Sequence, residues 1–281
     1  MGAQTLRNAL DQHPFVARLS QLVALSAADL KGLDAIIDGE LVIRKRRDLI
    51  ADGYEYRKLC FVKDGYAVRY KLLRNGKRQI RNVILPGDIV GLPGSFYERA
   101  VYSVTAITDL RMNVCALDSY VQLCYRHPQF GLALTWIAVQ EATTYAEHVI
   151  DVGRRTPVER LSNLLLELHA RLRAAGRAEA RRFTLPFSQE VIADVLGLSV
   201  PHVNRMMQQL RAEKLIADHE RVVEFLDPDA MQSSPITNRR RWRRPRCRPA
   251  RLEARKGVSG QRKRMPGRPV ASLTPPASGL H

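Results

Sequence analysis

Cysteine is scarce in this sequence, and the few cysteines are poorly placed for metal binding. The 281 residues contain four, Cys60, Cys115, Cys124 and Cys247, and no two of them form a C-x-x-C pair. Structural zinc sites and disulfide frameworks use closely spaced cysteines, so neither is expected here. We interpret the thiols as reduced and mostly buried, as in a cytosolic protein. Cys115 and Cys124 would form a redox pair only if the fold brings them together.

Long apolar runs and targeting signals are also missing. No run reaches the roughly 18 apolar residues that a membrane-spanning helix needs, and the N-terminal MGAQTLRNALDQHPF has no apolar signal core. These absences predict a cytoplasmic protein without membrane association. No nucleophile–base pair, metal-ligand spacing or phosphate-binding glycine loop is specific enough to suggest an enzyme, so we expect none.

Acidic residues are few relative to basic ones, and the imbalance lies mainly at one end of the chain. The net charge is +17, which suggests an anionic partner. Residues 239–281 contain 14 Lys or Arg and one acidic residue, Glu253, which leaves only +4 for residues 1–238. The composition of residues 231–281, rich in Arg, Pro, Ser and Gly, predicts a basic disordered tail.

The rest of the chain changes from a helical to a β-like pattern and back. Residues 1–37 look helical, with Ser26 as a candidate N-cap. Between residues 40 and 117, short β-like runs alternate with turn signals at Asp64-Gly65, Asn75-Gly76 and Pro86-Gly87-Asp88. Residues 103–117 read as a strand pair or one long strand. About eight strands fit this region, which predicts an antiparallel β-roll or jelly roll.

A long helix is predicted over residues 128–152, and its apolar residues form two stripes. Phe130 and Ile137 belong to one stripe, and Trp136, Val139 and Val149 belong to the other. A helix that is apolar on two sides needs two partners. We expect the β-roll on one side and the same helix of a second subunit on the other. The alternative is a helix buried wholly within one chain.

The stretch from Ser188 to Ile216 predicts two short helices joined by Gly197, which permits a left-handed turn. Ser188 and Ser199 are expected to cap the two helices. An amphipathic helix over 158–176, capped by Thr156, precedes them, and a small hairpin over 217–227 follows. The buried stripe of the second helix is predicted to be Val203, Met206, Met207 and Leu210. This is the helix-turn-helix pattern, whose second helix enters the major groove of DNA.

Residues 20–230 resemble the Crp/Fnr family of bacterial transcription regulators. The segments that carry the resemblance are LPGDIVG (85–91), YSVTAITDLRM (102–112), VGRRTPVERLSNLLLEL (152–168) and FSQEVIADVLGLSVPHVNRMMQQLRAEKLI (187–216), the last from the branch with "HVNR". The resemblance implies an α+β fold. Its parts are an N-terminal antiparallel β-roll (jelly roll) sensor domain over 1–127, a long dimerisation helix over 128–153 and a C-terminal winged helix-turn-helix over 154–230. It also implies homodimers on palindromic double-stranded DNA and contact with RNA polymerase.

The resemblance assigns candidate DNA contacts position by position. Arg205 matches the family arginine that reads a guanine, and a bidentate arginine–guanine pair is the commonest specific base contact. Val200 and Pro201 stand where relatives place a base-reading Arg or Glu, so the target sequence is expected to differ. His202 can reach a phosphate or a base edge, and the polar residues at the two helix starts are expected to meet phosphates. The full set of candidate contacts is Ser188, Gln189, Ser199, Val200, Pro201, His202, Asn204 and Arg205.

The resemblance does not assign the effector. Cyclic-nucleotide-binding members hold the ribose and cyclic phosphate with a Glu and an Arg-Ser or Arg-Thr pair. Those positions here are Leu92 and Ala100-Val101, and Arg99 would point to the other face of a strand. The oxygen-sensing branch uses N-terminal cysteines for an iron–sulfur cluster, and residues 1–40 contain none. No axial haem ligand is supported. We therefore predict no cofactor and no metal, and the signal stays open.

Two hypotheses of different classes follow from these patterns. The first is a sequence-specific DNA-binding transcription regulator, activator or repressor, that answers an unknown signal through its β-roll. The second is a ligand-binding regulatory module whose helix-turn-helix serves as a protein-contact surface. The basic tail is either an arm that follows the phosphate backbone or an extended, out-of-frame product of a GC-rich gene. Deleting residues 239–281 and comparing the salt dependence of DNA binding separates the two.

Overall fold

Two short helices open the part of the chain that the computed structural model describes, which comprises residues 12–76 and 78–227. They are α2 (Pro14–Leu19) and α3 (Ala27–Ala35). Ser26 caps α3 as predicted, because its hydroxyl accepts from the Asp29 N–H at 3.2 Å and the Asp29 carboxylate accepts from the Ser26 N–H at 2.7 Å. The basic tail and residues 1–11 lie outside the described residues.

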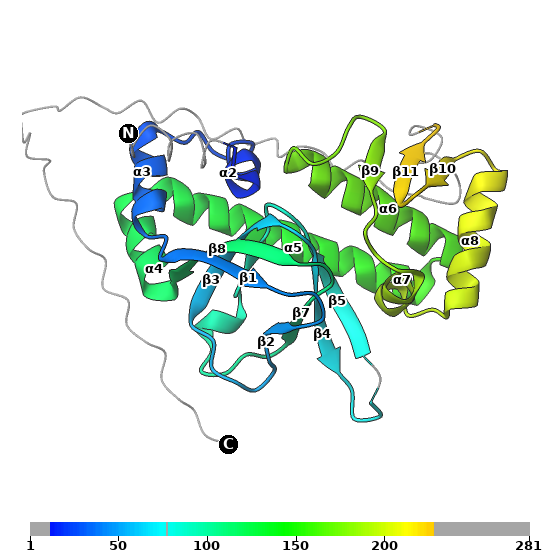
Figure 1. Cartoon of the computed structure of the whole chain (residues 1–281), viewed down its shortest axis with the longest axis horizontal. Coiled ribbons are helices and arrows are strands. Elements are labelled where there is room, and N and C mark those ends of the chain that lie inside the picture. Colours follow the sequence, from blue (N-terminus) through cyan, green and yellow to red (C-terminus); the bar gives the residue numbers. More distant parts are fainter. Residues whose placement is uncertain (1–11, 77, 228–281) are drawn as a thin grey trace, which may run out of the picture. The chain divides into compact units, whose positions relative to one another are not determined.

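Eight strands follow in two four-stranded antiparallel sheets (Figure 1). Their pairing orders are β1-β8-β3-β6 and β2-β7-β4-β5. The strands are β1 (Gly39–Ile43), β2 (Asp48–Ile50), β3 (Lys58–Asp64), β4 (Ala67–Leu72), β5 (Arg78–Ile84), β6 (Ile89–Val90), β7 (Ser103–Ala106) and β8 (Leu110–Ala116), with a short 3-10 turn η1 (Gly94–Phe96) between β6 and β7. This confirms the predicted antiparallel β-roll.

The region 103–117 contains two strands, as one version of the prediction held, but they do not pair with each other. β7 pairs with β2 and β4, whereas β8 pairs with β1 and β3, so the chain passes from one sheet to the other between them. This crossing lies against the Asp64-Gly65 turn. A Cβ on Gly65 would lie 2.1 Å from the Asp109 carbonyl oxygen, and its φ is +87°, so only glycine fits there.

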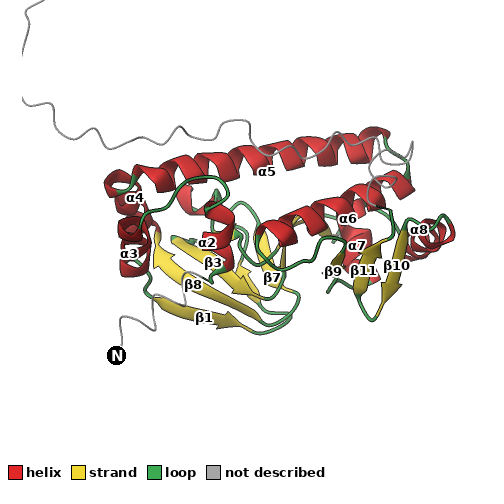
Figure 2. Cartoon of the chain, turned by 90° about the horizontal axis from the view of Figure 1, so that it is seen from above, coloured by secondary structure: helices red, strands yellow, loops and turns green. Residues whose placement is uncertain are grey.

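After helix α4 (Leu117–Arg126), the long helix α5 (Pro128–Arg154) runs past the β-roll (Figure 2). Phe130 and Ile137 from the first predicted stripe are buried, and so is Thr144 one further repeat along the helix. The second stripe is mostly exposed in the single chain, because Val139 is 51 % and Val149 is 72 % exposed. Trp136 of the same stripe is half-buried and packs against the core. The alternative prediction, a helix buried wholly within one chain, therefore does not hold for α5.

The remaining elements form a helical unit with a small sheet, and they match the predicted pattern. They are α6 (Pro157–Ala174), β9 (Arg182–Thr184), α7 (Gln189–Leu196), α8 (Val200–Ala212), β10 (Ile216–His219) and β11 (Val222–Phe225). The sheet has the order β10-β11-β9, so the predicted hairpin gains a third strand. Thr156 forms a capping box with Glu159 at the start of α6, which confirms that predicted cap.

One apolar core joins this unit to the β-roll. Leu161, Leu165, Phe187 and other buried side chains of the unit pack in the same cluster as four side chains of β4, β5 and the turn that follows, namely Val68, Ile80, Val83 and Leu85. Two ion pairs reinforce the contact: Arg171 of α6 lies 2.6 Å from Asp88, and Arg78 of β5 lies 2.5 Å from Asp194 of α7. Within the described residues, no helix is both long and apolar enough to cross a membrane.

Candidate nucleic-acid interface

Helices α7 and α8 are joined by a left-handed turn at Gly197, as the sequence predicts. Gly197 has φ +65° and ψ +37°, and the N–H of Leu198 reaches back to the Ala193 carbonyl at 3.0 Å. The Ser188 hydroxyl accepts from the Val191 N–H at 3.4 Å and so caps α7. The local sequence thus fixes where α7 stops and where α8 begins.

One face of α8 is buried against the rest of the helical unit. Val203, Met206, Met207 and Leu210 are each less than 9 % exposed, and all four belong to the core that the unit shares with the β-roll. These are the side chains predicted for the buried stripe. Their burial fixes which side of α8 is left for a partner.

The opposite face of α8 is exposed and polar. Pro201, His202 and Arg205 are exposed, as are Gln208 and Gln209. Ser188, Gln189 and Ser199 are exposed at the two helix starts. The structure therefore gathers six of the eight candidate contacts on accessible surface of one helix-turn-helix.

Val200 and Asn204 differ from this pattern, because both are half-buried. The Val200 side chain packs against the shared core, so it belongs only partly to the outer face on which the sequence placed it. Helical spacing within α8 did not predict the partial burial of Val200. It follows from the bend between α7 and α8, where Leu198 and Val200 both pack against the core.

Ser199 stands at the N-cap of α8, but its side chain does not cap the helix as the sequence predicted. Its hydroxyl lies 2.7 Å from Nδ1 of His202 instead. The backbone N–H of His202 bonds to the Ser199 carbonyl at 3.0 Å, so the N–H that a capping hydroxyl would accept from is already satisfied.

The tip of the β10–β11 hairpin holds a further cation that the sequence analysis did not single out. Glu220 and Arg221 form the two-residue turn, both with positive φ (46° and 70°), and both are exposed. Asn-Gly is the usual sequence signal for such a turn. Because Glu220-Arg221 lacks it, the sequence did not predict where the turn lies. Arg211 of α8 lies 2.8 Å from Asp218 of β10, which holds the hairpin beside α8.

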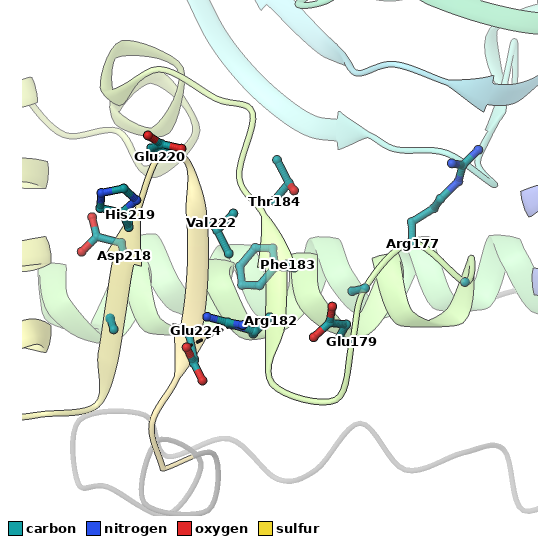
Figure 3. A pocket seen from close by; sticks show the side chains of 13 residues that line it. Arg177, Glu179, Arg182, Phe183, Thr184, Asp218, His219, Glu220, Val222 and Glu224 are labelled. Atoms are coloured by element: carbon teal, nitrogen blue, oxygen red, sulfur yellow. Dashed lines mark ion pairs between the residues drawn. The ribbon is translucent and has the colours of Figure 1, made fainter.

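A hollow of about 810 Å³ lies on the three-stranded sheet, and its charge does not suit DNA (Figure 3). Glu179, Asp218, Glu220 and Glu224 line it beside Arg177 and Arg182. Arg182 is held by Glu224 at 3.1 Å. Acidic side chains thus outnumber basic ones here, which disfavours phosphate contact on this side of the unit.

The β-roll interior faces α5 with a buried arginine. Arg69 of β4 is 2 % exposed, and its guanidinium carbon lies 4.7 Å from the centre of the Tyr102 ring. It donates to the Tyr145 hydroxyl at 3.0 Å and lies 3.5 Å from the Glu141 carboxylate, both on α5. Burial disfavours the charge of Arg69, but Glu141 and Tyr145 outweigh it and raise its pKa.

The sequence predicts that the residues at this place do not hold a cyclic nucleotide. By the family resemblance, the ligand-holding Glu and Arg are expected at the positions of Leu92 and Ala100, and Ala100 is 2 % exposed. The Leu92 carbonyl accepts from the Tyr102 hydroxyl at 2.9 Å, and the Tyr102 ring lies under Arg69. Tyr102 therefore links the turn at Leu92 to the Arg69 guanidinium, whose charge is matched by Glu141.

The cysteines of the described chain form no disulfide. Cys60, Cys115 and Cys124 are free thiols, and burial raises the pKa of Cys115 to about 12, which keeps its thiol protonated. No group of three or more His, Cys, Asp or Glu in residues 12–76 and 78–227 is arranged to hold a metal ion.

Two regions of the chain match models of known protein domains. Residues 40–127 match the model of the cyclic nucleotide-binding domain, and residues 159–234 match that of the Crp-like helix-turn-helix domain. The nitrogen fixation regulation protein FixK of Rhizobium meliloti is 30% identical over 66% of this chain and 82% of its own. The transcriptional activator protein Anr of Pseudomonas protegens is 27% identical over 76% of this chain and 87% of its own.

The structure of FixK2 from Bradyrhizobium japonicum superposes with a TM-score of 0.62 at 27% identity, covering 69% of this chain and 94% of that one. This chain covers most of the length of both relatives. Together with the exposed, polar face of α8, these likenesses show that the chain belongs to the Crp/Fnr family of DNA-binding transcription regulators.

Proposed function

We propose that the protein acts as a homodimer that reads a palindromic DNA site with α8 of each subunit. The observation that carries the proposal is the two-sided character of α8. One face is locked in a core shared with the β-roll, and the other presents His202 and Arg205 to solvent beside exposed helix starts. A recognition helix needs this combination, because base edges are read only by side chains whose orientation is fixed.

In this proposal, base reading and phosphate contact fall to different side chains. Arg205 reads a guanine through a bidentate pair. Ser188 and Gln189 meet phosphates at the start of α7, and Arg221 at the hairpin tip adds a phosphate contact on the flank of α8. Val200 and Pro201 contribute apolar contact only. The expected site therefore depends more on Arg205 than on the first turn of α8.

The exposed stripe of α5 supports the homodimer. Leu132, Val139 and Val149 lie on one side of the helix, with Ile150 and Val152 at its end, and each is at least 40 % exposed. A second copy of α5 would cover these side chains in a parallel pair. Two-fold symmetry would then set two copies of α8 to face successive major grooves, about 34 Å apart.

We assign the sensor role to residues 1–127, dimerisation to 128–153 and DNA binding to 154–230. Activation of transcription through contact with RNA polymerase is our expectation for the output, because the relative Anr is named as a transcriptional activator protein. Transcription in vitro with purified RNA polymerase, from a promoter that carries the selected site, tests this output directly.

Selection from random double-stranded DNA tests the core of the proposal. We expect an enriched palindrome with half-sites about 10 base pairs apart, centre to centre. A protein with Arg205→Ala serves as the matched control and should not enrich the same sequence. If the wild-type protein enriches no sequence, the helix-turn-helix is a protein-contact surface, which is the alternative function.

A further inference from the structure

The first turn of α8 differs from other capped helix starts in the described chain. Ser26, Thr156 and Ser188 each accept a hydrogen bond from the backbone N–H three residues on. Ser199 occupies the same N-cap position with the same extended backbone, φ −91° and ψ 154°, yet its hydroxyl makes no such bond. The hydroxyl of Ser199 is therefore available for another use.

Pro201 and the backbone of His202 explain why the hydroxyl is free. Proline has no N–H, so one of the donors that an N-cap side chain would satisfy is missing. The N–H of His202 bonds to the Ser199 carbonyl at 3.0 Å, and that of Val203 bonds to the same carbonyl at 3.1 Å. With these donors absent or occupied, the hydroxyl turns to the imidazole of His202, 2.7 Å from Nδ1.

This contact engages Nδ1 and leaves Nε2 as the ring nitrogen that is available to a partner. When the Ser199 hydroxyl donates to Nδ1, the neutral ring carries its proton on Nε2. A protonated ring would donate from Nδ1 to the hydroxyl oxygen and would again carry a proton on Nε2. In these two states Nε2 is a donor. In the third, a neutral ring donates from Nδ1 to the hydroxyl, and Nε2 is then an acceptor that cannot bond to the acceptor oxygens of phosphates. In all three states Nδ1 is withdrawn from contact with DNA.

We propose that Ser199 is a positioning residue that presents Nε2–H of His202 as a hydrogen-bond donor to an acceptor oxygen or nitrogen of DNA. The proposal rests on the DNA-binding function proposed above. His202 precedes Arg205 by three residues, so both lie on one side of α8, and both are exposed. Base-edge acceptors and phosphate oxygens share the required chemistry, and the pattern of loss distinguishes them.

A double-mutant cycle on the DNA sequence selected by the wild-type protein tests the proposal. Ser199→Ala and His202→Ala should each weaken binding about fivefold, the usual effect of one net hydrogen bond. The double variant should be no weaker than His202→Ala alone, because the hydroxyl acts only through the ring. Additive losses, or a Ser199→Ala protein that binds as the wild type does, would overturn the proposal.

His202→Gln provides the rescue. The glutamine amide can donate from near the place of Nε2, so this variant should bind within about twofold of wild type. It should also be insensitive to Ser199→Ala, because the amide does not need the hydroxyl to set its donor. A His202→Gln protein that still needs Ser199 would contradict the assigned role.

Thermal unfolding separates positioning from capping. Ser188→Ala removes a real cap and should lower Tm by about 2–4 °C. Ser199→Ala should leave Tm within about 1 °C of wild type, since its hydroxyl caps nothing. A drop as large as that of Ser188→Ala would show that Ser199 is a structural cap, and the positioning role would be lost.

Variation of the DNA identifies the acceptor. If His202 donates to a base edge, its loss abolishes discrimination at one base pair of each half-site, and if it donates to a phosphate, its loss weakens binding equally for all sequences. Either pattern supports the donor role, provided that Ser199→Ala reproduces it. Arg205→Ala tests the proposed function independently, so a failure of the Ser199–His202 contact is distinguishable from a failure of DNA reading.

Discussion

Arg205 offers the most direct test of base reading among the individual residues. It is exposed on α8, and the helix that carries it is fixed by buried side chains on its other face. Arg205→Ala should cost about 1–3 kcal/mol of binding free energy at one base pair of each half-site. Titration of the selected site and its single-base variants by fluorescence anisotropy measures this loss.

Arg205→Lys is the matched control, because lysine keeps the charge but not the planar fork. It should retain affinity for unrelated DNA while losing discrimination at the same base pair. Equal weakening at every position of the site for Arg205→Ala would instead place Arg205 on the phosphate backbone.

His13 makes stability depend on pH. It is 4 % exposed, its Nδ1 accepts from the Phe15 N–H, and burial lowers its pKa from 6.5 to about 4. The unfolded chain binds this proton near pH 6.5 and the folded chain only near pH 4, so the stabilisation is complete above pH 6.5 and is lost as pH falls toward 4. Between pH 7 and pH 5 the free energy of unfolding should fall by about 1–2 kcal/mol from this residue.

Urea unfolding at the two pH values measures the effect, and His13→Asn is the control. Asparagine can accept the same N–H at the start of α2 but does not titrate. The variant should show a smaller loss of stability on acidification. An identical pH dependence in both proteins would remove His13 as the cause.

Single residues were predictable where a local pattern decides their role. Ser26, Thr156 and Gly197 were found from the sequence because caps and left-handed turns depend on near neighbours. The burial of Arg69 was not found, because its partners Glu141 and Tyr145 come from a helix more than 70 residues away. A charged residue within a β-like run is normally predicted to face solvent, because the sequence does not show the distant partner that would allow its burial.

Helix α5 carries the exposed apolar stripe that we propose is covered by α5 of a second subunit. Val139 lies in the middle of the exposed stripe and is 51 % exposed. Val139→Asp would place one charge from each subunit in the helix pair, so we expect monomers at concentrations where the wild type is a dimer. Sedimentation equilibrium measures the change, and DNA affinity should fall with it because two half-sites can no longer be held together.

Tyr125→Asp is the control for a charge placed on other exposed apolar surface, because Tyr125 lies on α4 and is 77 % exposed. This variant should keep the mass and affinity of the wild type. A Val139→Asp protein that remains dimeric would show that the stripe is not the interface.

Elements were predicted best where their pattern is local and long. The bounds of α5 and α6 follow from helical spacing and from Thr156 and Pro157 at the junction. Pairing among the strands was beyond the sequence, because β7 and β8 are neighbours in the chain but belong to different sheets. Register is decided by partners that lie far along the chain, and alternation alone does not identify them.

The molecule as a whole is tied together by a buried charge network between the β-roll and α6. Asp88 accepts from Arg171 at 2.6 Å and from Arg18, and Arg171 also lies 3.0 Å from Glu167. Arg171→Met would leave Asp88 and Glu167 with less compensation in a buried place, at a cost of about 3 kcal/mol in the free energy of unfolding. Hydrogen exchange should rise most in α6 and in the turn around Asp88.

Arg44→Met is the control for this network. Arg44 pairs with Asp109 at 2.7 Å, but the arginine side chain is 79 % exposed, so its loss should have no measurable effect. Equal effects of the two substitutions in urea unfolding would contradict a special role for the buried pair.

The response to cyclic nucleotides is a property of the whole molecule, since it would require the β-roll to change α5. Arg69, Glu141 and Tyr145 already join these two elements, and Leu92 and Ala100 provide no charge for a phosphate. We therefore expect millimolar cyclic AMP to leave both Tm and DNA affinity unchanged. A shift of several degrees in Tm would show that a nucleotide binds despite these residues.

The shared core has a consequence for the modularity of the molecule. The side chains that support α8 pack with four side chains of the β-roll, Val68, Ile80, Val83 and Leu85. The DNA-binding domain is therefore not an independent module. Exchanging residues 154–230 for those of a relative would bring foreign apolar shapes against these four positions. Such a chimaera should fold well only after the four are repacked to match, so recombination within the family is expected to keep the β-roll and residues 154–230 together.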